Sequence, residues 1–258
     1  MSIATILSNS IIPTITQQSL YDGLKQAFLN SGFAATFDEY TSGTDRIMVF
    51  AFVQDASKTY GTTYLRIRVT SAYVIGMQLF ATWTAATDTG GSGSTEVTFT
   101  ALLTTTPIYC YSYNAGNEYK LVMLTQGTTT LALGVFSPAN KPDWWDMNIW
   151  NFAFIPVSNT FAIFRSTGLN PYANSENDTT LNSARMGTAN PHTNRRDILP
   201  GIILLNQANQ GISGRTSDDL IMCAGSGTTR FDILQAPGDT KQYSILNPIA
   251  GGLAVRTA

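Results

Sequence analysis

The sequence predicts a mainly β protein of the α+β class, built from antiparallel sheets or a sandwich with an N-terminal amphipathic helix and extended polar loops. Short runs of residues alternate apolar and polar side chains, as half-buried strands do. Turn-forming residues separate these runs at intervals of roughly ten positions. The composition agrees, because the 35 Thr suit pleated strand surfaces and the 21 Gly and 17 Asn suit turns.

A helix is predicted near the N-terminus. Thr14 followed by Gln17 fits a capping box at its start. Gly32 stands where a left-handed C-terminal cap belongs. Gly23 weakens the helix interior by roughly 1 kcal/mol, so we expect the helix to depend on packing against another surface.

One face of this helix is apolar. Leu20, Leu24 and Phe28 recur at the i, i+4, i+8 spacing of a single helical stripe. The surface that covers the stripe belongs either to the same chain or to a neighbouring subunit. The three residues are therefore a candidate interface helix.

Strands are predicted over most of the remaining chain. Residues 63–70 give the clearest pattern, because Leu65, Ile67 and Val69 alternate with polar side chains and predict one buried and one wet face. The other predicted strands are 47–53, 95–102, 107–113, 118–124, 128–135, 201–205, 220–224, 230–234 and 242–246.

Two segments between the predicted strands receive other interpretations. Residues 72–83 place apolar side chains at helical spacing and predict a second short helix. Residues 89–94 contain three glycines and predict a flexible loop. The glycines do not form a phosphate-binding loop of the Walker type, which would require a following lysine.

The chain is long enough for one large β domain or two small ones. Residues 1–140 are expected to form a helix and an antiparallel β domain. Residues 141–258 are expected to hold an aromatic-rich segment, a long polar arm over 168–197 and a C-terminal β segment. A single domain that includes both parts is the alternative.

The aromatic-rich segment is the strongest candidate for a functional site. It contains Trp144, Trp145, Trp150, Phe152 and Phe154. Such a cluster is most often part of a core. It is also typical of protein interfaces, where Trp residues contribute much of the binding energy, and it could form a platform on which sugars stack.

Catalytic chemistry is not expected. The single histidine, His192, lies in a polar segment and is expected to be a solvated loop residue, and zinc sites need three or four His, Cys or carboxylate ligands. Asp143 and Asp146 flank two tryptophans and are the best glycosidase candidates, but residues three apart seldom face each other across a substrate. We predict no catalytic, cofactor-binding or metal-binding residues and no cofactor.

The remaining ionisable residues support a structural role. Asp38-Glu39 and Asp218-Asp219 are expected to be caps or solvated turns. Cys110 and Cys223 lie in apolar, strand-like contexts and are expected to be buried free thiols rather than a disulfide.

Charge and hydropathy argue against several classes of partner. The formal net charge is −2 and the pI is about 5.3, which does not suggest nucleic-acid binding. No apolar run approaches membrane-spanning length, and the N-terminus does not resemble a secretion signal. The protein is expected to be made in a cytoplasm, with no membrane insertion.

Three segments resemble proteins from the structural gene clusters of tailed bacteriophages, including phages of cyanobacteria. They are residues 58–69 (KTYGTTYLRIRV), 116–120 (GNEYK) and 142–145 (PDWW). The resemblance implies a non-enzymatic virion subunit, in a tail baseplate or at a fibre attachment, that contacts other virion proteins and forms a homo-oligomer such as a trimer or hexamer. The alternatives are a module of a tail fibre that binds a host receptor or surface glycan, and a capsid decoration or connector protein.

Overall fold

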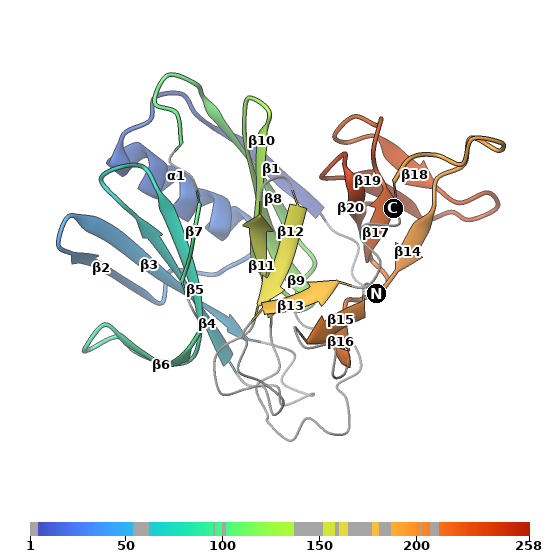
Figure 1. Cartoon of the computed structure of the whole chain (residues 1–258). Helices are drawn as coiled ribbons and strands as arrows, with labels where there is room; N and C mark the ends of the chain where they lie inside the picture. Colours follow the sequence, from blue (N-terminus) through green and yellow to red (C-terminus); the bar gives the residue numbers. More distant parts are fainter. Residues whose placement is uncertain are drawn as a thin grey trace.

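The computed structural model shows a mainly β protein with antiparallel, curled sheets (Figure 1). It describes residues 5–53, 62–94, 96–99, 102–136, 152–157, 160–164, 177–180, 187–201, 203–206 and 212–258. Three sheets are present in this part of the chain. We call the nine-stranded sheet A, the six-stranded sheet B and the five-stranded sheet C.

Sheet B contains the strands that follow the helix in sequence. Its order is β2-β3-β4-β5-β6, and β7 also pairs with β5. The strands are β2 (Asp38–Ser42), β3 (Asp45–Val53), β4 (Thr62–Val69), β5 (Ile75–Thr84), β6 (Thr89–Gly93) and β7 (Val97–Thr98). The prediction for β4 is confirmed, since Leu65, Ile67 and Val69 are fully buried while the side chains between them are half-buried.

The predicted second helix over residues 72–83 is wrong, because this segment forms most of β5. Ile75 and Leu79 are spaced by four residues and share the core face of β5, because a spacing of four keeps side chains on one face of a strand as well as of a helix. Trp83 lies on the opposite face of the sheet. The spacing alone therefore does not separate the two structures. The segment is a strand because its backbone pairs antiparallel with β4, from Val69 to Tyr64.

The predicted flexible loop over residues 89–94 is also wrong, because residues 89–93 form β6. The glycines have a packing function there. A Cβ atom at Gly90 or Gly93 would overlap the Phe80 ring, and one at Gly91 would overlap the Thr82 hydroxyl. Glycine thus leaves the space that side chains of the neighbouring strand β5 occupy.

Sheet A is the longest sheet and contains strands from most of the sequence. Its order is β1-β8-β9-β10-β11-β12-β13-β15-β16. The strands are β1 (Thr5–Ile12), β8 (Ile108–Asn114), β9 (Tyr119–Gln126), β10 (Thr129–Phe136), β11 (Phe152–Val157), β12 (Thr160–Phe164), β13 (Asn177–Thr180), β15 (Ile203–Asn206) and β16 (Ile212–Arg215). Because β10 pairs with β11, strands from both sides of residue 140 share this sheet. The segment 168–197 is not all loop, since β13 lies within it.

Helix α1 (Gln17–Asn30) follows β1. Its N-cap is Thr16, which forms a capping box with Ser19. The predicted Thr14–Gln17 box is therefore wrong by register. Gln17 instead donates hydrogen bonds to the carbonyl oxygens of Thr44 and Val69, at 2.7 and 3.0 Å.

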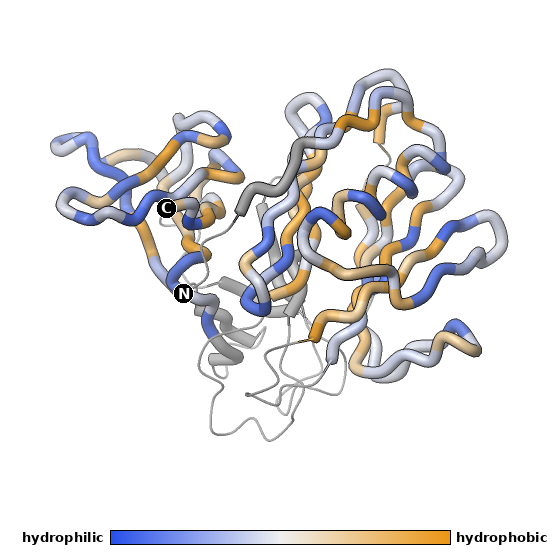
Figure 2. Tube along the Cα trace, turned by 180° about the vertical axis from the view of Figure 1, so that it is seen from behind, coloured by the Kyte–Doolittle hydropathy of each residue, from blue (hydrophilic) through white to orange (hydrophobic). Residues whose placement is uncertain are grey.

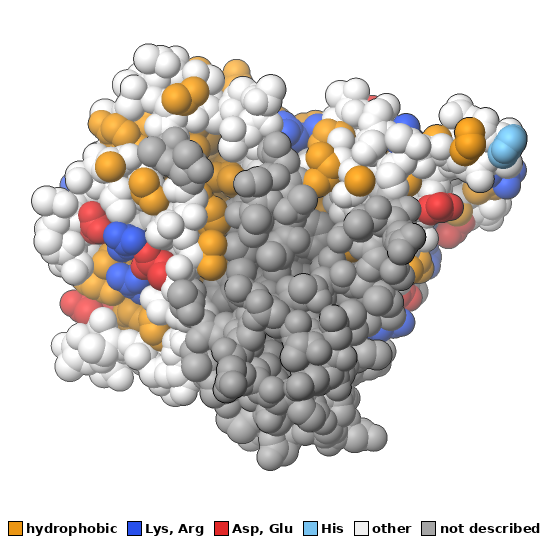
Figure 3. Space-filling model, viewed as in Figure 1, with side chains coloured by type: hydrophobic (Ala, Val, Ile, Leu, Met, Phe, Trp, Pro, Cys, Tyr) orange, Lys and Arg blue, Asp and Glu red, His pale blue; other side chains and the backbone are white. Residues whose placement is uncertain are grey.

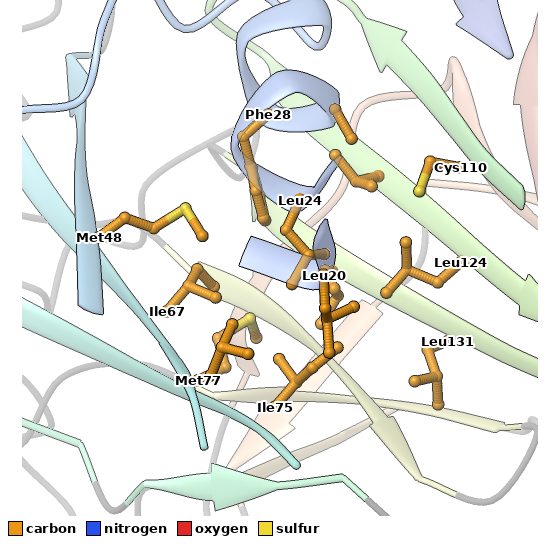
Figure 4. Packing of buried hydrophobic residues seen from close by; sticks show 14 of the residues in the cluster. Leu20, Leu24, Phe28, Met48, Ile67, Ile75, Met77, Cys110, Leu124 and Leu131 are labelled. Carbon is orange, nitrogen blue, oxygen red and sulfur yellow. The ribbon is translucent and has the colours of Figure 1, made fainter. Parts of the chain in front are cut away.

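One large core lies between sheet B, α1 and one face of sheet A. The helix contacts strands of both sheets. Figure 4 shows its apolar side chains meeting residues of sheet B and sheet A at the centre of this core. The labelled residues are Leu20, Leu24, Phe28, Met48, Ile67, Ile75, Met77, Cys110, Leu124 and Leu131.

Sheet C covers the opposite face of sheet A. Its order is β14 (Ile198–Pro200), β17 (Leu220–Ala224), β20 (Ala250–Arg256), β19 (Gln242–Ile245) and β18 (Ile233–Gln235). A second core joins Tyr113, Leu121 and Met123 of sheet A to Met222 and Leu253 of sheet C. Figure 2 shows the hydrophobic residues concentrated along the strands and the hydrophilic ones in the outer loops.

The close packing of β9 and β10 gives a first prediction. A Cβ atom at Gly134 would overlap the backbone oxygen of Lys120 and lie 2.9 Å from the Cα atom of Leu121. Backbone atoms in the middle of a sheet cannot move aside, so Gly134→Ala should lower the free energy of unfolding by about 3 kcal/mol, measured by urea denaturation.

Gly187→Ala is the matched control. Among the described residues, nothing lies within 4 Å of a Cβ atom at Gly187, so this change should stay within about 0.5 kcal/mol of wild type. Equal stability of the two variants would contradict the proposed approach of β9 to β10.

Candidate functional site: an apolar surface where sheets A and C meet

The predicted aromatic site falls mainly outside the described residues. Trp144, Trp145 and Trp150 lie there, as do Asp143 and Asp146. Phe152 and Phe154 are residues of β11, whose backbone pairs with Phe136 and Gly134 of β10. The core, interface and sugar-platform interpretations of the cluster therefore stay predictions.

The candidate interface helix is corrected by the burial of its side chains. Leu20, Leu24 and Phe28 have no exposed surface within the single chain. They belong to the core between sheets A and B, and Phe28 stacks on Phe50 with ring centroids 5.0 Å apart. The surface that this helix depends on is intramolecular, so these side chains are not available to another subunit.

The predicted states of the histidine and the two cysteines are confirmed. His192 is exposed in a turn, where its backbone N–H donates to the side chain of Asn190 at 2.9 Å. Cys110 and Cys223 are buried free thiols on β8 and β17. Burial raises the pKa of each thiol to about 11, which makes both unreactive near neutral pH.

Asp218 lies in a turn and is exposed, as predicted, whereas Asp38, Glu39 and Asp219 are not simple caps or solvated turn residues. Asp38 and Glu39 lie on β2, where Asp38 accepts a hydrogen bond from Trp83 Nε1 at 2.7 Å. Asp219 is only 2% exposed and forms an ion pair with Arg256 at 3.2 Å. This buried ion pair has a structural role, because it joins the ends of β17 and β20, which pair with each other.

Charged side chains form a network on sheet B. Glu96 forms ion pairs with Arg66, at 2.8 Å, and with Arg68, whose other partner is Asp45 at 2.7 Å. Hydrogen bonding to Glu96 raises the pKa of Arg68. Figure 3 shows the acidic and basic side chains interleaved on this side of the molecule. The charges neutralise one another, so the network stabilises the sheet and does not present a charged binding site.

The same sheet is curled by contacts between strands that are not neighbours. Trp83 on β5 bonds Asp38 on β2, although β3 and β4 lie between them. Flat neighbouring strands are about 4.8 Å apart, so the two side chains meet because the sheet bends toward them. Arg66 Nε also donates to the Tyr40 hydroxyl of β2 at 3.1 Å.

A different face of the molecule carries exposed apolar side chains. Ile11 on β1 pairs in register with Tyr109 on β8, and their side chains are 55% and 41% exposed. Phe231 and Ile233 of sheet C are 36% and 52% exposed. The Phe231 ring packs edge-on against Tyr111, with centroids 4.8 Å apart. We call Ile11, Tyr109, Phe231 and Ile233 the junction surface.

The register explains why this surface is open. Ile11, Tyr109, Thr125 and Thr130 lie opposite one another on four successive strands and form one row across sheet A. Sheet C packs on the rows beyond it and reaches this row with the Arg230 side chain, which donates to the Thr130 hydroxyl. The row is thus the rim of the A–C interface, and its apolar side chains remain partly in water.

Two buried tyrosines next to this rim have unusual surroundings. Tyr113 and Tyr119 are almost fully buried between sheets A and C, and neither hydroxyl has a hydrogen-bond partner in the part of the chain that the structure describes. Burial raises the pKa of both phenols. A buried hydroxyl without a partner costs about 1–3 kcal/mol, so these two groups weaken the contact between the sheets.

The described residues contain no cluster of three or more His, Cys, Asp or Glu side chains placed to hold a metal ion. Among them, no helix combines the length and the apolar character needed to span a bilayer. The chemistry that the junction surface offers is burial of apolar area against a partner.

Comparison with known proteins does not add a family. The sequence matches no protein-family model, and no curated protein matches it significantly. The candidate site therefore rests on the geometry described above.

Replacing the partnerless hydroxyl tests the environment of Tyr119. Tyr119→Phe should raise the free energy of unfolding by about 1 kcal/mol, because the change removes a buried polar group and keeps the ring. Tyr21→Phe is the matched control, since the Tyr21 hydroxyl is bonded to Glu39 at 2.8 Å, and it should lower stability by about 1 kcal/mol. Denaturant titration measures both; destabilisation by Tyr119→Phe would contradict the partnerless hydroxyl.

The buried thiols predict a loss of stability in alkali. Both thiols ionise near pH 9 in the unfolded chain and near pH 11 in the folded one. Between these values the unfolded state releases protons that the folded state keeps, so the free energy of unfolding falls as pH rises, by up to about 2–3 kcal/mol per thiol. Below pH 8 this contribution is complete.

A Cys110→Ala/Cys223→Ala protein should lose less stability than wild type between pH 9 and 11, measured by urea denaturation at each pH. The buried tyrosines titrate alike in both proteins, so the difference isolates the thiols. Parallel pH profiles would contradict the burial of the two thiols.

Proposed function

We propose that the chain is a non-enzymatic structural subunit of a bacteriophage virion, in a tail baseplate or at a fibre attachment, that acts through protein interfaces. The bacteriophage assignment rests on the resemblance of residues 58–69, 116–120 and 142–145. The interface role rests on the junction surface. Its location would be the virion tail, after synthesis in the host cytoplasm.

The junction surface carries the proposal because its exposed residues are large and apolar, and three of them, Ile11, Tyr109 and Phe231, are linked through Tyr111. Scattered single apolar residues are ordinary on a protein surface, whereas contiguous ones mark interaction sites. Ile11 and Tyr109 are register neighbours, Tyr109 and Tyr111 lie on the same face of β8, and Tyr111 contacts Phe231. The patch is therefore continuous from the edge of sheet A to sheet C.

The composition supports the same role. Charged residues are 12% of the chain, about half the usual share. A Thr-rich surface with few charges suits a subunit whose neighbours cover much of it, because burying charged groups at an interface is costly. A homo-oligomer with further contacts to other virion proteins is the assembly we propose.

A capsid decoration or connector role would use the same surface in another part of a virion. The glycan-binding alternative uses a different site, namely Trp144, Trp145 and Trp150. A glycan array with wild type and Trp→Ala variants tests that alternative separately.

Native mass measured by light scattering at several concentrations tests the proposal. Wild type should form a discrete oligomer of the 27.9 kDa chain. Ile233→Lys should weaken the assembly at least tenfold, because it places a charge in the apolar surface.

Val53→Lys is the control, because Val53 is as exposed, at 55%, but lies on sheet B. It should assemble like wild type. A protein that is monomeric at every concentration, or an Ile233→Lys protein that assembles normally, would contradict the proposed role of this surface.

A further inference from the structure

The sheet edges differ in how well they are protected against pairing with another chain. An edge strand exposes a row of unpaired backbone N–H and C=O groups, and proteins block such edges with short strands, charges, proline or distortion. In the described part of the chain, the sheets end at β1 and β16, at β2, β6 and β7, and at β14 and β18.

All of these edges except β1 are short, charged or interrupted by glycine or proline. Strand β2 contains two carboxylates, β6 is interrupted by three glycines, and β7 has two residues. Strand β14 is three residues long and ends in a proline, β16 has four residues including a glycine and an arginine, and β18 has three residues. None of them offers a long row of free backbone groups.

Strand β1 has one irregularity, a register shift against β8 between Ile6 and Ser8, and its regular part runs from Ser8 to Ile12. It spans eight residues, Thr5–Ile12, with the sequence TILSNSII, which contains no charged residue, proline or glycine. Its one described strand partner is β8. Every second residue of β1 therefore directs its N–H and C=O away from β8, along the outer side of sheet A.

At the end of β1, one face of the strand is packed against α1 and the other face is exposed. Ile12 is 3% exposed and fits against Gly23 of α1, where a Cβ atom would overlap the Ile12 side chain. Ile11 points to the opposite face and is 55% exposed. A side chain on a paired strand is covered by cross-strand neighbours on both sides, and Ile11 has such a neighbour only in Tyr109 among the described strands.

We propose that β1 pairs antiparallel with β1 of a second copy of this chain across a two-fold axis, which joins two A sheets into one. A second copy is the favoured occupant because the two strands have equal length and carry no charges that would repel. The other described edges are too short, or carry too many charges or glycines, to pair with the regular part of β1, Ser8 to Ile12. Pairing of β1 with itself also consumes both open edges, so the assembly closes and does not grow into a fibre.

This inference rests on the proposed assembly function and makes it more specific. A two-fold axis requires an even number of subunits. The dyad is compatible with a dimer or with a hexamer that contains two-fold axes, and it excludes a trimer with three-fold symmetry alone. The junction surface continues from Ile11 and would lie beside the new strand pair.

Disulfide trapping tests the strand pairing. Single cysteines are introduced at the centre of β1, as Ser8→Cys and Asn9→Cys, in the full chain with its two buried native thiols. Under mild oxidation at least one variant should form a covalent dimer on non-reducing gels. Thr41→Cys places the control cysteine on the blocked edge strand β2 and should remain monomeric on the gel.

A charge on the edge gives the second test. Ile11→Lys should abolish the even-numbered oligomer in light scattering while the melting temperature at low concentration stays at the wild-type value, because the side chain is exposed in the monomer. Val53→Lys serves as the control of equal exposure. Oligomers that form without cross-links at positions 8 and 9 overturn the β1 pairing and leave the assembly function standing. Oligomers that persist in Ile11→Lys count against both proposals, because Ile11 also belongs to the junction surface. A chain that is monomeric at all concentrations overturns both.

Discussion

The structure depends on the burial of β8, β9 and β10 on both faces. An antiparallel sheet usually has one face in water, but here almost every residue of β9 and β10 is buried. Alternate side chains of the same strands belong to the two different cores, Val122 and Leu133 to one and Leu121 and Ala132 to the other. These strands are stable only if a layer covers each side of them.

The other elements of the fold supply those two layers. Helix α1 and sheet B cover one face, and sheet C covers the other (Figure 1). Where sheet C ends, the row through Tyr109 stays partly exposed. Where sheet A ends, β1 is held against α1 through Ile12 and pairs with β8 alone among the described strands. The junction surface and the edge of β1 are the two features proposed to join subunits. Both lie where the layers around the same central strands end.

The sequence predicted the local part of this structure better than the long-range part. Alternation in β4 and the apolar contexts of Cys110 and Cys223 are local signals, and both predictions are confirmed. Residues 72–83 failed because a spacing of four fits a strand as well as a helix. Asp219 was misjudged because its partner Arg256 is distant in the chain. The junction surface could not be predicted, since it depends on where sheet C stops on sheet A, and β1 lacks the clear alternation that identified β4.

Native-state hydrogen exchange, resolved to peptides, tests the central role of β8–β10 most directly. If these strands are the shared centre of both cores, their amides should exchange most slowly, at the rate of global unfolding, while the peripheral strands β2, β6 and β18 exchange earlier. The opposite order, in which sheet B or sheet C stays protected after β8–β10 have exchanged, would show that the outer layers are stable without the central strands and would contradict this account.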